Sequence, residues 1–489
     1  MTGEISNQRR KDQLMRSLFL WMSVAACAEM PLITCAEQKT VSPGETVTVA
    51  GSDISSWAAA DIDIGAGATL LFSEPTESVV FTKKITGSGH FVARSANTTK
   101  PWEFKMNGDA TGFTGGFFYT NVLARIVSPT SVGDSARITI YVEYNTGNGA
   151  KSHFFGPTTA GMPDYIYRNP LDVRVGPNNG LVVNDRTVLA GDIIHRYGVI
   201  HGPGTITGNI TTYATAITFA DNLTVEGSCH AANSGAKIDN VNTIYLKGKT
   251  YGFSQFSVIN CYNPVYLEGD NLFGENVVLQ MGENWTGDGK YSGRLELNGH
   301  SQIFKRAFFK MNLDSPEYEK LKEVGGIGNT GAPATITFAD NDDGKWFLGR
   351  LDGHLSVRVS GPKMLGFSSV LTNSMDGTIT HSGERGGGSI VMGGAWPNLK
   401  KIESVNGGLV DIRNPATINP KATIDIDGSS QIKVATGLTL TVRTLRINGV
   451  ELPIGTYNKS SPAVDGRFER NGNGYVKVTG APGFKVLIK

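Results

Sequence analysis

Short runs in which apolar and polar residues alternate recur along most of this chain. Typical runs are TVTVAG (46–51), ARITIYVEY (136–144), NTIYLKG (242–248) and LTLTVRTLRING (438–449), each ending at or beside Gly or Asn. A side-chain period of two is typical of half-buried β-strands. The pattern therefore predicts an all-β protein that is built from many short strands.

These runs also repeat at similar distances. TIYLKG and PVYLEG lie 21 residues apart, and further apolar runs follow at 277–281 and 295–297. Strands that return every 15–21 residues favour the coils of a β-solenoid, with Gly and Asn at corners that need a positive φ. About 20 rungs at ~4.8 Å would form a rod of roughly 100 Å. A chain of β-sandwiches is the competing fold.

One stretch carries helical signals. In DSPEYEKLKEVGG (314–326), Ser315 is a candidate N-cap, Pro316 occupies the first position and Gly325 stands at the end. A short helical insertion is therefore predicted near 315–324. The predicted organisation is a signal with its flank at 1–36, a β-rich part at 37–200, the solenoid at 201–480 and a tail at 481–489.

The N-terminus predicts export. Four basic residues within 9–16 precede the short apolar run SLFLWMSVAACA (17–28), with cleavage expected after Ala28 or Ala36. That run is shorter than the ~20 apolar residues of a membrane-spanning helix, and no other segment is long and apolar enough. A disordered or buried N-terminal helix is the alternative. Residues 24–27 also resemble a bacterial lipobox, which makes Cys27 a lipidation candidate.

Two cysteines, Cys229 and Cys261, would remain after removal of the signal, since Cys27 and Cys35 lie in or beside it. Export makes a disulfide between them reasonable, and two buried free thiols are the alternative.

The overall charge is close to neutral. The chain has 45 Lys and Arg against 44 Asp and Glu, for a net charge of +1. This gives no electrostatic argument for binding nucleic acid or an anionic membrane.

The acidic stretch ITFADNDDGKW (336–346) is the candidate metal site, with Asp340, Asp342 and Asp343 as calcium ligands. However, the third acid comes one position too early for the D-x-D-x-D-G spacing of a calcium loop. ITFADN also occurs at 217–222, where no acidic cluster follows. The stretch is therefore interpreted mainly as a solvated turn, and Ca²⁺ is the only cofactor considered.

Three tryptophans lie in turn-rich surroundings: Trp285, Trp346 and Trp396. Exposed aromatic rings beside Asn and Asp suit stacking on sugars, so these residues are candidates for ligand stacking. The alternative is that the rings pack inside the coils or cover their sides.

Two turn motifs suggest a family. WEFKMNGDATGFTGGFFYTN (102–121) has a Gly-Asp turn followed by Phe-Thr-Gly, and 440–478 has an NGVELPIGTY turn before a final G-x-G-x-V-x-V strand. With SGRLELNGHSQIFKRAFF (292–309), they resemble the autotransporter-associated β-strand repeat of bacterial passenger-like proteins. The resemblance covers about 80 residues. It implies a right-handed β-helix of an exported, adhesin-like protein. Because Lys489 follows soon after, no membrane β-barrel is expected.

The leading hypothesis is a non-enzymatic, exported solenoid at the cell surface, on the outer membrane or outside the cell, which binds a glycan or another surface ligand. The alternative is a β-helix polysaccharide lyase or glycoside hydrolase, because stacked coils can place two carboxylates about 6.5–9.5 Å apart for inverting hydrolysis. A purely structural part of a surface layer is a third hypothesis.

Overall fold

The computed structural model describes residues 37–480, except for 97–101, 134–136, 143–152, 157–163, 176–179, 234, 236, 241–242, 248–249, 260–263, 283–292, 310–324, 348, 368–370 and 415. Several predictions concern residues outside this set: the export signal, the helix at 315–324, Cys27, Cys261 and Trp285.

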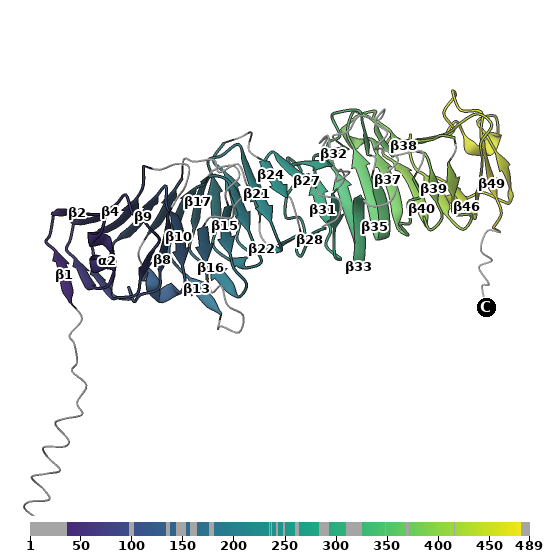
Figure 1. Ribbon diagram of the computed structural model, residues 1–489. Helices are drawn as coiled ribbons and strands as arrows, with labels where there is room; N and C mark the ends of the chain where they lie inside the picture. The colour runs from purple at the N-terminus through teal and green to yellow at the C-terminus, as the bar shows by residue number, and fades with distance from the viewer. Residues whose placement is uncertain are drawn as a thin grey trace, which may run out of the picture.

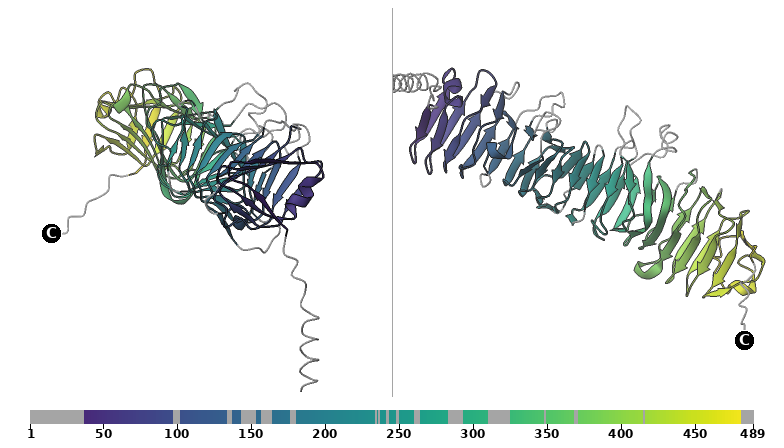
Figure 2. Two further views of the ribbon diagram at one scale, coloured as in Figure 1. Left: turned by 90° about the vertical axis from the view of Figure 1, so that its left-hand side faces the viewer. Right: turned by 90° about the horizontal axis from the view of Figure 1, so that it is seen from below.

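The described chain is all-β and winds into a right-handed solenoid of about 15 turns. Figures 1 and 2 show a rod in which the strands of successive turns stack along one axis. Both the all-β class and the right-handed β-helix are confirmed. The turns are fewer than the 20 rungs predicted because the coils are longer: Ile193 pairs with Ile210, 17 positions on, but Leu279 pairs with Ala307, 28 positions on.

Three faces surround the core. The first begins as a ten-stranded parallel sheet: β2 (Thr46–Ala50), β4 (Thr69–Ser73), β7 (His90–Arg94), β9 (Gly116–Thr120), β11 (Ile138–Tyr141), β14 (Leu171–Arg174), β17 (Ile193–Tyr197), β20 (Ile210–Thr212), β23 (Cys229–Ala231) and β26 (Tyr251–Gly252). Its ladder continues across position 200 from β17 to β20, and the predicted domain division there stays a prediction.

The second face begins as an 11-stranded sheet: β5 (Val79–Phe81), β8 (Glu103–Met106), β10 (Leu123–Ile126), β12 (His153–Phe155), β15 (Gly180–Val183), β18 (Val199–His201), β21 (Ala216–Ala220), β24 (Lys237–Asn240), β27 (Gln255–Val258), β29 (Val278–Met281) and β32 (Arg306–Phe309). It continues, through contacts of β32 with β34, as β34 (Lys345–Phe347), β36 (Leu365–Phe367), β38 (Ile390–Met392), β41 (Leu409–Ile412) and β44 (Gln431–Val434).

The third face contains β13 (Tyr165–Tyr167), β16 (Thr187–Leu189), β19 (Thr205–Ile206), β22 (Leu223–Val225), β25 (Ile244–Leu246), β28 (Val265–Leu267) and β30 (Arg294–Glu296). Two long strands, β33 (Gly326–Phe338) and β35 (Arg350–Ser360), then turn from the third face onto the first without a break. The start of β33 pairs with β30, and its end pairs with β31 (Gln302–Phe304).

Beyond this bend, the first face continues from the end of β35 as β37 (Thr378–Ser382), β40 (Lys401–Val405), β43 (Thr423–Ile426) and β46 (Thr444–Ile447). The third face continues as β39 (Ala395–Trp396), β42 (Thr417–Ile418) and β45 (Thr439–Val442). The remaining short elements are β1 (Gln38–Val41), β3 (Asp61–Ile64), β6 (Ile85–Gly87), η1 (Pro129–Ser131), η3 (Gly383–Arg385) and η4 (Pro462–Val464).

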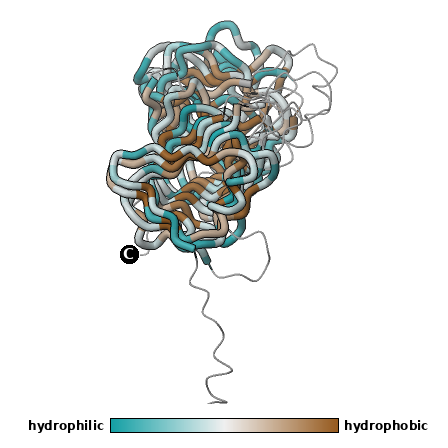
Figure 3. The backbone as a smooth tube through the Cα atoms, turned by 60° about the vertical axis from the view of Figure 1, so that its left-hand side comes forward, coloured by the Kyte–Doolittle hydropathy of each residue, from teal (hydrophilic) through white to brown (hydrophobic). Residues whose placement is uncertain are grey.

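The predicted repeat is confirmed in the stacking of β25 on β28. Ile244 lies opposite Val265 and Leu246 opposite Leu267, with these four side chains buried. Between them, the rings of Tyr245 and Tyr266 stack with centroids 5.1 Å apart. In general, alternate residues point inward, so one apolar core runs the length of the rod, as the brown inner stretches of Figure 3 show.

Elements that do not continue the parallel stacking lie at both ends of the rod. At the N-terminal end, α2 (Asp53–Ala58) packs against β2 and β5 and buries Ile54 and Ala58. At the other end, β47 (Val450–Glu451) runs antiparallel to β46, and β48 (Gly455–Tyr457) runs antiparallel to β49 (Tyr475–Val478). These elements occupy the ends of the second-face sheet at β5 and of the first-face sheet at β46, where an open strand edge could pair with another chain.

Corner chemistry follows the sequence prediction only in part. Asn121, Asn222, Asn298 and Asn406 adopt the positive φ expected of corner residues. The corner between the third and first faces uses glycine for a different reason, close approach: a Cβ on Gly208 would lie 2.0 Å from the carbonyl oxygen of Gly191. Gly227 stands in the same relation to Gly208, so these glycines form a column.

Gly208→Ala should lower the free energy of unfolding by about 1–3 kcal/mol, because a backbone atom, not a flexible side chain, blocks the new methyl group. Thermal unfolding followed by circular dichroism measures the loss. Gly387→Ala is the matched control, since nothing lies within 4 Å of its Cβ position. An equal loss in both variants would contradict the close-approach explanation.

Candidate binding surface

A group of tyrosine, arginine and aspartate side chains, exposed or half-buried, lies on the outer side of the first face. Its members occupy outward positions of β11, β14 and β17, or directly follow β20, and we call them the tyrosine–arginine face: Tyr141, Asp172, Arg174, Arg196, Tyr197 and Tyr213. Ladder pairing aligns Tyr141 with Arg174, and Arg174 with Tyr197. Successive coils therefore place these side chains in a line along the rod.

A β-bulge enlarges this surface. The pairing of β14 with β17 shifts between Val173 and Arg174, so one extra residue is accommodated in β17. As a result, the consecutive residues Arg196 and Tyr197 are both exposed, although strict alternation would turn one of them inward. Tyr197 is 44% exposed and Tyr213 is 52% exposed, among the largest exposures of bulky apolar or aromatic residues in the described chain.

The arginines are held by specific contacts. The guanidinium carbon of Arg174 lies 4.8 Å from the ring centroid of Tyr141, and its Nη1 donates a hydrogen bond to the Tyr141 hydroxyl at 2.5 Å. Arg196 donates two hydrogen bonds to Asp172, at 2.6 and 2.8 Å, and lies 5.5 Å from the ring of Tyr213. Paired contacts of this kind fix the orientation of the side chains before any ligand arrives.

A shallow groove adjoins the tyrosine–arginine face on the outer side of β4, β7, β9 and β11. Its lining includes His90, Arg94, Phe118 and Tyr141. The rings of His90 and Phe118 meet edge to face, with centroids 5.3 Å apart. The outer side of the first face thus presents aromatic rings and cations over several consecutive coils.

The acidic stretch predicted as a turn or calcium loop connects β33 to β34 and is tied to the preceding coil. Asp342 lies 2.6 Å from the Nζ of Lys305, and Asp343 lies 2.5 Å from Nη1 of Arg306. The hydrogen bond from Lys305 is the main cause that holds the pKa of Asp342 below its usual range. Asp340 donates its backbone N–H to the Lys305 carbonyl at 2.9 Å.

The carboxylates of Asp342 and Asp343 are therefore already paired with the side chains of Lys305 and Arg306. Within the described residues, no group of three or more metal-ligating side chains comes together. The earlier copy of the motif also ends at a corner: Asp221 has a φ of 59° and its carboxylate lies 2.8 Å from Nδ1 of His201. The arrangement at Asp342 and Asp343 therefore fits a turn that joins neighbouring coils.

The two tryptophan candidates among the described residues, Trp346 and Trp396, have lateral and inward positions. Trp396 is fully buried, donates its indole N–H to the Gly393 carbonyl at 2.6 Å and packs on Phe367. Its ring offers no face to a ligand, because β39 turns it into the core. Trp346 is partly buried and lies against Gly366 of the next coil, where a Cβ would come within 2.4 Å of the indole.

Cys229 is a free, fully buried thiol, and its burial raises its pKa above the usual range. Burial with a raised pKa is typical of an unreactive thiol.

The most deeply buried acid in the middle of the rod, Glu296, has hydrogen-bond partners within the fold. Its carboxylate accepts hydrogen bonds from the backbone N–H of Thr330 at 2.6 Å and from Arg294 at 3.1 Å. Arg294 bridges it to Asp352 in a later coil.

Comparison of the chain with protein-family models, with curated proteins and with solved structures found no match. Among the helices of the described part, none has the length and apolar character needed to cross a membrane.

Proposed function

We propose that this protein is an exported β-solenoid that binds glycans along the tyrosine–arginine face without transforming them. The observation that carries this proposal is the alignment of exposed Tyr197 and Tyr213 with Arg174 and Arg196 on consecutive coils. Tyrosine rings offer apolar surface for the C–H groups of sugars, together with a hydroxyl for hydrogen bonding. Arginine adds planar donors that suit hydroxyl and carboxylate groups.

Export and a surface location rest on the basic and apolar N-terminal segment. The likeness of 102–121, 292–309 and 440–478 to passenger-like repeats supports an adhesin-like role. A long, rigid rod suits such a role because it can hold a binding surface away from its point of attachment. Paired side chains on stiff strands also favour recognition without large movement.

The double variant Tyr197→Ala/Tyr213→Ala should weaken glycan binding about tenfold or more, because exposed aromatic anchors dominate such contacts. Binding is measured with the purified protein on a panel of neutral and acidic polysaccharides, and soluble oligosaccharide is assayed in the same samples. Tyr475→Ala is the matched control, since this tyrosine is also exposed, at 41%, but lies in β49 near the other end.

Two outcomes would contradict the proposal. Equal weakening by Tyr475→Ala would show that the tyrosine–arginine face has no special role. Release of oligosaccharide by the unaltered protein would replace passive binding with the lyase or hydrolase alternative.

A further inference from the structure

The corner between the third and first faces changes character along the rod. In the N-terminal half it carries the glycine column, with Asp192, Asn209 and Ser228 beside it. In the C-terminal half the same corner carries a column of mainly basic side chains, which we call the basic corner: His354, Asp376, Lys400, Lys421 and Arg443. Each member stands on a different coil, and all but His354, which lies within β35, come shortly before a first-face strand.

Backbone hydrogen bonds hold this column in register. Asp376 donates its N–H to the Gly353 carbonyl at 3.0 Å, Lys400 donates to Gly377 at 3.1 Å and Arg443 donates to Ala422 at 3.0 Å. Neighbouring coils lie about 4.8 Å apart. The side chains of the basic corner therefore recur at short, regular steps along the rod axis.

A second row of polar side chains runs beside the basic corner. Ser374, Asn398 and Asn419, from three successive coils, line one shallow groove together with His354, Asp376, Lys400 and Lys421. Asn398 donates its side-chain N–H to the Ser374 carbonyl at 3.2 Å, and Asn419 accepts the backbone N–H of Lys421 at 3.0 Å. The groove is thus built from ordered polar groups, and its lining contains no Phe, Tyr or Trp.

Charge is poorly balanced in this groove. Asp376 is its one acid, and it is shared between His354 at 2.9 Å and Lys400 at 3.3 Å. Lys421 and Arg443 are exposed, and neither pairs with an acid anywhere in the described part of the chain. The next residue along the chain from Lys400 differs in this respect: Lys401, at an outward position of β40, pairs with both Glu403 and Asp425.

We propose that the basic corner is a second binding site, which takes a linear acidic polysaccharide lying along the rod axis. Repeated carboxylate or sulfate groups on an extended chain would meet Lys400, Lys421 and Arg443 in turn, and the amides of Asn398 and Asn419 would contact its hydroxyl groups. Single-stranded nucleic acid fits less well, because its binding sites combine cations with aromatic rings on which bases stack. The site lies in the opposite half of the rod from the tyrosine–arginine face.

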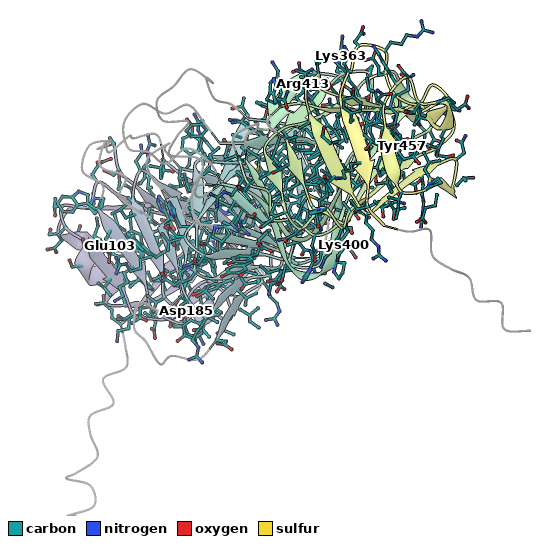
Figure 4. All side chains as sticks on the ribbon, turned by 90° about the vertical axis from the view of Figure 1, so that its right-hand side faces the viewer. Glu103, Asp185, Lys363, Lys400, Arg413 and Tyr457 are labelled. Atoms are coloured by element: carbon teal, nitrogen blue, oxygen red, sulfur yellow. The ribbon has the colours of Figure 1, made fainter. Side chains whose placement is uncertain are left out.

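The test compares the unaltered protein with the triple variant Lys400→Gln/Lys421→Gln/Arg443→Gln. Binding is measured to hyaluronan, which carries carboxylates, to dextran sulfate, to uncharged dextran and to single-stranded DNA, each at low and moderate salt. The matched control is Lys363→Gln/Lys459→Gln/Arg470→Gln, which removes the same charge from other exposed positions. Figure 4 shows Lys363 on the opposite side of these coils from Lys400.

The triple variant should bind hyaluronan or dextran sulfate about tenfold more weakly or worse, since it loses three charge-assisted contacts. The control variant should bind the acidic glycans like the unaltered protein. Any binding of uncharged dextran should be the same with and without the basic side chains of this corner. Preference between hyaluronan and dextran sulfate tells which anionic group is recognised. Equal losses in both variants, no binding to either acidic glycan, or binding to DNA as tight as to the glycans would overturn the proposal.

Discussion

Phe91→Ala should lower the free energy of unfolding by about 3–5 kcal/mol, among the largest effects of any single substitution in this chain. Phe91 is fully buried in β7, and its ring lies 5.3–5.9 Å from four other aromatic rings: Phe72, Phe81, Phe104 and Phe117. Alanine would leave a cavity bounded by these rings and would also remove the edge-to-face contacts with Phe81 and Phe104.

The loss should be local at first. Coils of a solenoid contact mainly their neighbours, so the cavity weakens the stack between β4 and β9 before it affects distant coils. Hydrogen exchange should show earlier opening of these strands in the variant, together with a lower thermal midpoint. Phe118→Ala is the control, because Phe118 lies on the outer side of β9. Similar losses from both substitutions would mean that the aromatic core does not stabilise these coils.

Acidification from pH 7 to pH 5 should destabilise the fold by roughly 6 kcal/mol. The reason is three buried histidines. Burial lowers the pKa of His153 to about 3 and that of His381 to about 4. Burial also lowers the pKa of His195 to about 4, and this effect outweighs that of its hydrogen bond to the Gly198 carbonyl, which raises the pKa. Their unfolded value is about 6.5, so below that pH the unfolded chain binds protons that the folded chain does not.

The sign and window follow from these values. Stability is fully present above pH 6.5 and is lost as pH falls toward 4, at about 1.4 kcal/mol per pH unit for each histidine. The thermal midpoint, followed between pH 7 and pH 5, measures the slope. In His381→Gln the slope should shrink by about a third, because glutamine can still accept the Leu409 N–H but does not titrate. A midpoint independent of pH over this range would contradict the burial of these rings as neutral groups.

Much of the fold could be predicted from local pattern. Alternating runs such as TIYLKG and PVYLEG give the strands, and their separation of 21 residues is also the observed pairing distance of Tyr245 and Tyr266. The number of turns was overestimated because coil length depends on insertions at the corners, which leave no periodic signal. The bend at β33 and β35 also escaped prediction, since one continuous strand serves two faces there.

The candidate sites were harder to predict. Sequence context marked Trp396 as a turn residue, but the direction of a ring depends on where β39 sits in the coil, and there it points inward. The tyrosine–arginine face was missed although its signal is present: the outward positions of ITIY, LDVR and IIHRY hold tyrosine, aspartate and arginine. Only the register between coils brings these residues together, and register is a long-range property.

The caps at the two ends of the rod have a consequence for its evolution and engineering. The parallel stacking runs from the coil of α2 to the antiparallel pairs with β47 and β48, so an interior coil has a parallel coil on each side. Inserting or deleting one whole coil would change the reach of the rod by about 4.8 Å and expose no new strand edge. The rod is thus a spacer whose length can change by whole coils outside those that carry the tyrosine–arginine face and the basic corner.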